Sequence, residues 1–314
     1  MLSDLEKRMD PESLERLKAI LKVQTVAIKA IHDYFEEKNF LQLMPVILSK
    51  YTDPISTGSE PGLNPGKIVY QNQELKLTQS MILNKQVAIG SGIDKLYIFS
   101  PNVRLEDPDK FYTGQHLIEF TQVDFEVADA EMVDIFKLVE GLLRRSYIDI
   151  KNKASEELSF LRRKISPWKE NFPVFTSHEL MERYGENWIK ESSKDQNTPF
   201  FVTCFNRYFY DKLDEEQQGT HYKNYNLVYP EGYGVGLSGG EREYDFERIM
   251  DRMKSLGLSR YDYHEYLLRS QAGLIVPSAG AGLGLERMIR YFTGVEHIGD
   301  IQLFRRIPGE LINL

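Results

Sequence analysis

The sequence predicts an α+β fold, in which a mainly antiparallel sheet is flanked by helices and interrupted by a helical insertion. Two arms within residues 97–128 alternate apolar and polar side chains with period two, as the strands of a hairpin do. Residues 11–38 repeat apolar side chains at helical spacing. From residue 68 onward the segments read as hairpins and long crossovers, which favours antiparallel pairing with helices packed on the sheet.

Composition limits the class of protein. The 314 residues, 41% hydrophobic and 27% charged, are typical of a globular protein with one large domain or two moderate ones. A net charge of −8 argues against generic attraction to nucleic acid or to an anionic membrane. The single cysteine, Cys204, excludes an internal disulfide, and no leader or membrane-length apolar run is present, so we expect a cytoplasmic protein.

The first elements are a long helix and a short strand. Asp10 and Pro11 are good start signals for the helix at 11–38. Pro45 interrupts the strand predicted at 41–48, which favours a position at a sheet edge or an interface. This pair of elements fits a dimerisation role, and core packing explains it equally well. The loop at 49–67 is rich in Gly, Pro and Ser, which predicts a mobile lid or a disordered segment.

Two segments outside the hairpin have features of carboxylate binding. Ser80 is a predicted N-cap, and Lys85 lies about one turn into the helix, so this helix start could attract an anion. A plain capped helix with a solvated lysine is the alternative. Arg242 follows the glycine-rich segment 232–244 and is a candidate for bidentate carboxylate binding, or a surface arginine.

The hairpin at 97–128 places an arginine, carboxylates, an amide and an aromatic ring on one sheet face. The loop between its arms is long for a hairpin, which indicates a role beyond turning. An ordinary half-exposed hairpin with a charged outer face is the alternative. The following stretch, 129–198, is mostly helical and has no chemical motif.

A glycine-rich turn joins a strand to a helix at 275–288. Its spacing is GxGxG, and too little chain follows for half of a dinucleotide-binding domain, so that function is excluded. A strand, a small-residue turn and a helix with Arg287 near its start fit anion binding at the sheet instead.

Three stretches together resemble the signature motifs of class II aminoacyl-tRNA synthetases, in the aspartate and asparagine branch. HDYFEEKNFLQLMPVILS resembles motif 1 (about 28–50), VRLED…GQHLIEFTQVDFE motif 2 (about 97–128) and GAGLGLERMIRYFTG motif 3 (about 275–294). LTQSMILNKQ and LSGGERE resemble the substrate-binding segments of this branch. The resemblance implies a single class II catalytic domain over 1–314, with a helical insertion at about 130–198. Because only some ten residues precede the first predicted helix, where the family's full-length synthetases have an anticodon-binding barrel, we expect no anticodon-binding domain. The resemblance also implies a homodimer through motif 1.

The resemblance implies roles for residues at two neighbouring sites. The catalytic roles fall to Arg104 and Arg287. ATP would be bound by Arg104, Glu106, His116, Phe120 and Arg287. The amino acid would be bound by Ser80, Lys85, Gln122, Asp124 and Arg242. The two cations at the amino-acid site favour a carboxylate side chain, since a neutral amide would leave their charge uncompensated.

The metal positions of the family are altered in this sequence. Where the family has an Asp and a Glu for Mg²⁺, this chain has Asn226 and Val235, while Ser238 retains a hydroxyl at a third position. An amide oxygen is a weaker Mg²⁺ ligand than a carboxylate, and valine offers no ligand. We therefore expect Asn226 and Ser238 to be weak metal ligands.

Within the branch, the sequence is most similar to archaeal asparagine synthetase-related proteins. It therefore predicts an ammonia-using asparagine synthetase that takes aspartate through a β-aspartyl-adenylate, with ATP and Mg²⁺ as cofactors, and releases AMP and pyrophosphate. On this interpretation tRNA and membranes are not partners. The alternatives are an adenylating enzyme of the asparaginyl- or aspartyl-tRNA synthetase type with another acceptor, or a catalytically impaired paralog that binds amino acid and nucleotide.

Overall fold

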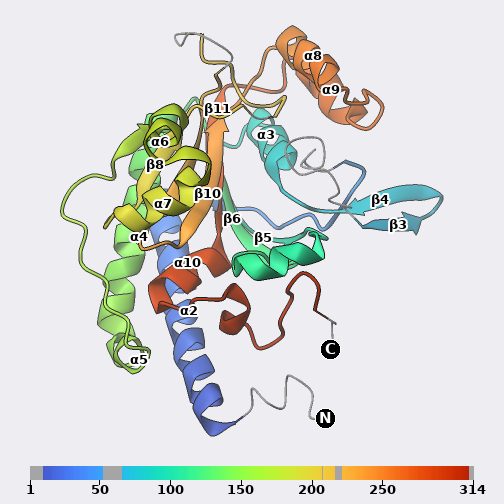
Figure 1. Cartoon of the computed structure of the whole chain (residues 1–314). Helices are drawn as coiled ribbons and strands as arrows, with labels where there is room; N and C mark the ends of the chain where they lie inside the picture. The colour runs from blue at the N-terminus through green and yellow to red at the C-terminus, as the bar shows by residue number, and fades with distance from the viewer. Residues whose placement is uncertain (1–9, 52–65, 207, 216–220, 311–314) are drawn as a thin grey trace.

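The computed structural model describes residues 10–51, 66–206, 208–215 and 221–310 (Figure 1). Within them, an eight-stranded sheet has the strand order β1 (Leu41–Gln42), β5 (Lys95–Val103), β6 (Glu119–Ala128), β11 (Ser278–Gly284), β10 (Gly234–Glu241), β9 (Asn224–Tyr229), β8 (Phe200–Thr203) and β7 (Val174–Thr176). Neighbouring strands are antiparallel except at the two edges, where β1 runs parallel to β5 and β7 parallel to β8. A smaller sheet has the order β2 (Leu48–Ser49), β4 (Gln73–Leu77) and β3 (Lys67–Tyr70).

The helices flank this sheet. They are α2 (Pro11–Glu37), α3 (Ile82–Gly90), α4 (Met132–Lys153), α5 (Ser155–Phe160), α6 (Ser177–Tyr184), α7 (Trp188–Asp195), α8 (Phe246–Ser255), α9 (His264–Gln271) and α10 (Leu285–Thr293). Short 3-10 turns cover Pro108–Thr113, Gly185–Asn187 and Ile298–Ile301. The predicted antiparallel sheet, its flanking helices and the helical insertion are confirmed. Among the described residues, we find no helix with the length and apolar character needed to cross a membrane.

The N-terminal elements follow from local sequence. Asp10 caps α2, because its side chain accepts hydrogen bonds from the amides of Glu12 and Ser13 at 3.1 Å each. The strand expected at 41–48 is split into β1 and β2, with Pro45 in the irregular stretch between them. Most of the loop interpreted as a lid lies at 52–65, outside the described residues.

The period-two pattern of β6 separates the core from the site. Val123 and Phe125 point into the main hydrophobic core, where Phe125 packs against Phe35 of α2 with ring centroids 5.5 Å apart. Residues of α2, α4 and α10 complete this core, and these helices cover one face of the sheet (Figure 1). Asp124 and Glu126 therefore belong to the opposite face, where the polar side chains of the hairpin gather.

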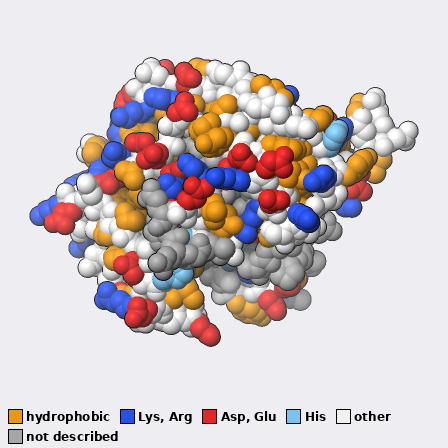
Figure 2. All heavy atoms as spheres, turned by 90° about the horizontal axis from the view of Figure 1, so that it is seen from above, with side chains coloured by type: hydrophobic (Ala, Val, Ile, Leu, Met, Phe, Trp, Pro, Cys, Tyr) orange, Lys and Arg blue, Asp and Glu red, His pale blue; other side chains and the backbone are white. Residues whose placement is uncertain are grey.

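The surface seen from above mixes both signs of charge. Acidic and basic side chains are interspersed with apolar ones on this face, without a patch of a single sign (Figure 2). This agrees with the modest net charge of −8. This face therefore offers no patch of one charge sign to a ligand or partner.

Candidate active site

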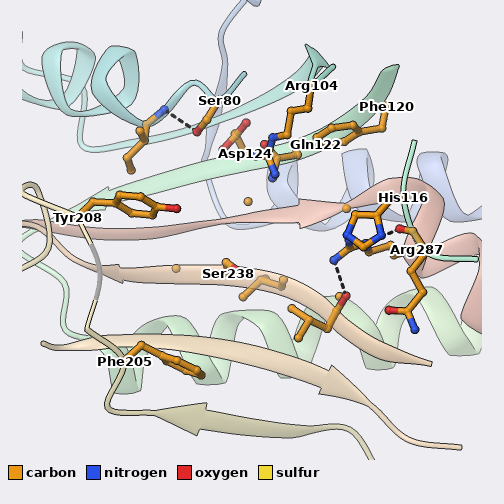
Figure 3. Close-up of a pocket in the computed structure, with 18 of the residues that line it drawn as sticks. Ser80, Arg104, His116, Phe120, Gln122, Asp124, Phe205, Tyr208, Ser238 and Arg287 are labelled. Atoms are coloured by element: carbon orange, nitrogen blue, oxygen red, sulfur yellow. Dashed lines mark hydrogen bonds between the residues drawn. The ribbon is translucent and has the colours of Figure 1, made fainter. Parts of the chain in front are cut away.

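A cavity of about 450 Å³ opens on the sheet face opposite the main core (Figure 3). Its floor is formed by glycines of β10 and β11, so that backbone lies open where side chains would otherwise stand. A Cβ at Gly282 would lie only 3.0 Å from Gln122 Nε2 and 3.1 Å from Asp124 Oδ1. The glycine therefore leaves room for those two side chains and for a ligand above the strand.

The cavity brings together every predicted site residue except Asn226. Those that line it come from α3, β6, β10, α10 and the loops beside them: Ser80, Lys85, Arg104, Glu106, His116, Phe120, Gln122, Asp124, Ser238, Arg242 and Arg287. Asn226 lies behind Ser238, as its neighbour on β9, and is buried. The roles of these residues remain predictions.

A network of buried charges forms one end of the cavity. Lys85 Nζ lies 3.0 Å from Asp124 Oδ1 and 3.5 Å from Glu126 Oε2. It also donates to the carbonyls of Phe125 and Ala281, at 3.2 and 3.0 Å. The lysine predicted as a solvated or ligand-binding cation is thus paired inside the protein. Its position on α3 explains this, because the helix packs directly against β6.

Arg242 belongs to the same network. Its guanidinium makes a bidentate pair with Glu126, with Nε to Oε1 at 2.8 Å and Nη2 to Oε2 at 3.1 Å. Asp211 lies 3.8 Å from Nη1 of the same arginine. Although burial opposes a charged carboxyl group, Arg242 and then Lys85 hold the pKa of Glu126 below its usual value. The interpretation of Arg242 as a surface residue is wrong, since it is buried.

Asp124 has one carboxylate oxygen engaged and one available. Its Oδ1 pairs with Lys85, whereas Oδ2 is buried and has no hydrogen-bond partner among the described residues. Ser80 is drawn beside it and lines the same cavity (Figure 3). The predicted N-cap at Ser80 is wrong by one residue: Met81 is the cap position, and Ser80 Oγ accepts from the amide of Ile82 at 3.3 Å. An ammonium group between Ser80 and Asp124 would satisfy the buried oxygen.

The other end of the cavity carries arginines held by backbone carbonyls. Arg104 donates from Nε and Nη2 to the carbonyl of Gln79, at 3.2 and 3.1 Å. Its guanidinium lies 5.0 Å from the ring centroid of Phe120. Arg287 donates to the carbonyls of Gln115 and Val235, at 3.3 and 3.0 Å. Arginines fixed in this way are suited to binding phosphate oxygens.

Several residues of the site were not predicted from the sequence. Glu126, which lies behind the cavity lining and pairs with Lys85 and Arg242, is on the same alternating face of β6 as Asp124, so the period-two pattern contained the signal for it. Asp211, Phe205 and Tyr208 lie in the irregular stretch after β8, where no periodicity marks them. The Tyr208 hydroxyl points into the cavity (Figure 3).

Glu286 at the start of α10 provides a pH-dependent contact. Both its carboxylate oxygens accept from the amide of Thr121, at 2.9 and 3.0 Å. Burial raises the pKa of Glu286 from 4.5 to about 7, more than that amide lowers it. Because the folded state binds this proton more tightly, its contribution to stability is full below pH 4.5 and is lost as pH rises through about 7.

We expect Glu286→Gln to remove this pH dependence. The wild-type free energy of unfolding should fall by about 1–2 kcal/mol more than that of the variant between pH 5 and pH 8, since the residue is only partly buried. Urea denaturation of both proteins at the two pH values measures the difference. Parallel losses in the two proteins would show that Glu286 does not titrate in this range.

The chain is similar in sequence and in structure to several known proteins. The chain is 28% identical to an aspartate–tRNA(Asp/Asn) ligase of Methanopyrus kandleri, over 97% of this chain and 72% of the relative. It is 27% identical to an asparagine–tRNA ligase of Thermococcus kodakarensis, over 94% of this chain and 70% of the relative. The crystal structure of asparaginyl-tRNA synthetase from Pyrococcus horikoshii, complexed with asparaginyl-adenylate, superposes with a TM-score of 0.85 and 25% identity. That superposition covers 98% of this chain and 75% of the other.

These relatives correct two predictions. The ammonia-using asparagine synthetase is wrong, because proteins that match almost the whole chain are ligases of aspartate or asparagine to tRNA. The expectation that tRNA is not a partner is wrong for the same reason. Both depended on the acidic composition and on the short segment before the first helix. Neither property reports on which acceptor receives an activated amino acid.

The family itself is established by the match to a family model. The family model described as tRNA synthetases class II (D, K and N) matches residues 3–308. Members of this family are ATP-dependent ligases. The antiparallel sheet, the glycine-floored cavity and this match lead to one conclusion: the chain belongs to the class II tRNA synthetases of the aspartate, lysine and asparagine group.

Proposed function

We propose that the cavity activates asparagine, and aspartate less well, as an aminoacyl-adenylate and transfers the acyl group to tRNA. An oxygen of the α-carboxylate attacks the α-phosphorus of ATP, the bond to the β-phosphate breaks, and pyrophosphate leaves. A ribose hydroxyl at the 3′ end of tRNA then attacks the acyl carbonyl and releases AMP. Support comes from the family match and from the asparaginyl-adenylate bound in the related synthetase.

The charge balance of the amino-acid end is the observation that favours asparagine. Among the residues that the structure describes, two buried cations, Lys85 and Arg242, are paired with three buried carboxylates, Asp124, Glu126 and Asp211. In their charged forms these groups leave one negative charge, which the ammonium group of the substrate neutralises. The cations therefore do not need a carboxylate ligand. A second carboxylate, as in aspartate, would be buried without a cation of its own.

The opposite end fits the nucleotide. The Phe120 ring beside the Arg104 guanidinium offers a surface on which an adenine base can stack. Arg104 lies where negative charge would build on the α-phosphate, and Arg287 would bind the terminal phosphates. Glu106 and His116 line the same region and would contact the base and the phosphates.

We expect asparagine to support ATP–pyrophosphate exchange with a kcat/KM about tenfold or more above that of aspartate. Leaving a buried charge unpaired costs more than about 1.4 kcal/mol, which corresponds to at least a factor of about ten. The variant Asp211→Asn removes one negative charge from the amino-acid end and should reduce this preference. Exchange of labelled pyrophosphate into ATP, measured with each amino acid, tests both statements.

Two outcomes would contradict the proposal. If neither amino acid supports ATP–pyrophosphate exchange, the proposed adenylation is wrong. If aspartate is preferred, the charge balance of the cavity does not determine which amino acid is selected. Charging of tRNA transcripts specific for asparagine and for aspartate tests the acceptor separately. If the amino acid is adenylated but neither transcript is charged, the proposed activation is supported and tRNA is rejected as the acceptor.

We also infer that two copies of the chain associate through the segment 41–48. Its apolar side chains are unusually exposed: Leu41 by 63%, Met44 by 78% and Ile47 by 51%. Exposed apolar side chains gathered on one short segment are typical of an interface, and β1 is an edge strand of the main sheet. We expect Met44→Asp with Ile47→Asp to convert a dimer to a monomer in sedimentation-velocity experiments. A wild-type monomer would contradict this inference.

A further inference from the structure

The strands β9 and β10 form a strip beside the cavity. It contains Asn226, Val235 and Ser238, at the positions where the family resemblance implies metal ligands. Ser238 on β10 faces Asn226 on β9 in the register of the sheet. The Ser238 hydroxyl donates to Asn226 Oδ1 at 2.7 Å. The amide oxygen, which is the stronger of the two potential metal donors here, is thus already an acceptor within the protein.

Val235 makes the same strip apolar. Its side chain lines the cavity and also packs on the hydrophobic cluster beneath α6 and α7, together with Phe205. That cluster contains Leu180, Trp188, Phe200, Val202 and Val228. The side chain at position 235 therefore extends the apolar cluster to the cavity wall, where a carboxylate ligand would require polar surroundings.

This donor set does not fit a divalent metal ion. Mg²⁺ requires near-octahedral oxygen coordination and is usually bound through one or two carboxylates. The strip offers one hydroxyl and one amide oxygen, which are hydrogen-bonded to each other. Over the residues that the structure describes, no group of three or more His, Cys, Asp or Glu side chains is arranged to hold a metal ion.

A guanidinium lies against this strip instead. Arg287 Nη1 donates to the backbone carbonyl of Val235 at 3.0 Å, and its Nε donates to the carbonyl of Gln115. Arg104 is similarly fixed on the carbonyl of Gln79. Backbone carbonyls thus help to orient both guanidinium groups, a geometry suited to binding phosphate oxygens.

We propose that β9 and β10 bind no divalent ion directly, and that any metal enters only on the phosphates of the nucleotide. The first statement concerns the protein alone, whereas the second rests on the proposed function, because it takes the nucleotide to bind in this cavity. The proposal predicts nucleotide affinity that depends little on free metal.

The experiment uses Mn²⁺ alone and a non-hydrolysable ATP analogue with an α,β-methylene bridge. Electron paramagnetic resonance should detect no stoichiometric binding of Mn²⁺ to the wild-type protein. Calorimetry should give analogue affinities within about threefold in Mg²⁺ and in EDTA. The double variant Asn226→Asp with Val235→Glu should gain a Mn²⁺ site and bind the analogue at least about tenfold more tightly with Mg²⁺ than with EDTA.

A matched variant controls for added charge. Asn187→Asp with Val174→Glu introduces the same two changes at exposed positions outside the cavity, and should gain no Mn²⁺ site. Stoichiometric Mn²⁺ binding by the wild-type protein would overturn the proposal, as would a larger effect of EDTA on its nucleotide affinity. If the double variant at positions 226 and 235 folds but fails to bind Mn²⁺, the proposal is also overturned, because the metal positions then lie elsewhere. Because the Mn²⁺ measurement needs neither nucleotide nor turnover, it remains decisive if adenylation fails.

Discussion

Glu126→Gln is expected to lower the free energy of unfolding by about 3–5 kcal/mol, the usual cost of removing one partner from a buried ion pair. Glu126 is fully buried and pairs with both Arg242 and Lys85. Its removal leaves two buried cations short of a carboxylate, and their burial limits how far solvent compensates for the loss. Guanidinium denaturation of wild type and variant measures the loss.

Two further variants allow the loss of stability in Glu126→Gln to be compared with the loss of weaker contacts. Ser278→Ala removes only the hydroxyl that donates to Glu126 at 3.0 Å and should cost about 1 kcal/mol. Glu15→Gln breaks the exposed pair with Lys18, which lies at a similar distance of 2.7 Å, and should leave stability unchanged within measurement. If Glu126→Gln lowers the free energy of unfolding no more than Ser278→Ala does, the prediction is contradicted, because the buried ion pairs of Glu126 would then not stabilise the fold together.

The network also predicts acid sensitivity. Because the cations hold the pKa of Glu126 below its usual value of 4.5, its stabilising contribution is present above that pH and is lost as pH falls through the lowered pKa. Glu126→Gln should therefore remove part of the acid-induced loss of stability. The direction is opposite to that for Glu286, so denaturation on both sides of pH 5 distinguishes the two carboxylates.

Arg104→Gln is expected to lower the rate of asparagine-dependent ATP–pyrophosphate exchange by about 10²–10³, the usual effect of removing one preorganised donor from a developing anion. The guanidinium is fixed by two hydrogen bonds to one carbonyl and lies beside the Phe120 ring, so it needs no reorganisation as charge develops. Steady-state exchange rates at saturating asparagine and ATP measure the effect.

The control for Arg104 is an arginine with the same change outside the site. Arg260→Gln alters an exposed residue between α8 and α9 and should leave the exchange rate unchanged. Thermal unfolding of Arg104→Gln should also remain close to wild type, because its partners are carbonyl groups and not a buried charge. A loss in rate of less than tenfold for Arg104→Gln would contradict its assignment to the phosphate end.

The sequence predicted the sheet from local patterns, and most of the lining of the cavity from the resemblance of its motifs to those of the class II synthetases. Period-two alternation places Gln122, Asp124 and Glu126 on one face of β6, and the helical period identifies α2. These patterns are properties of single segments, so they can be read without knowing which segments are neighbours.

The charge balance could not be predicted, since it depends on which strands pair. Arg242 meets Glu126 because β11 lies between β10 and β6, an order that no single segment specifies. Lys85 and Arg242 therefore seemed to require a ligand carboxylate when considered alone. The register also brings Ser238 opposite Asn226, so that the Ser238 hydroxyl donates to Asn226 Oδ1. The acceptor was mispredicted because composition and chain length do not determine it.

Native mass spectrometry of the protein mixed with asparagine, ATP and Mg²⁺, in the absence of tRNA, tests the central claim most directly. An enzyme that activates asparagine in a buried, charge-balanced cavity should retain the asparaginyl-adenylate, and the Arg104→Gln variant should retain far less. The proposed function predicts a bound mass equal to that of the adenylate, with pyrophosphate released to solution. Asparagine and ATP bound together without conversion would contradict it.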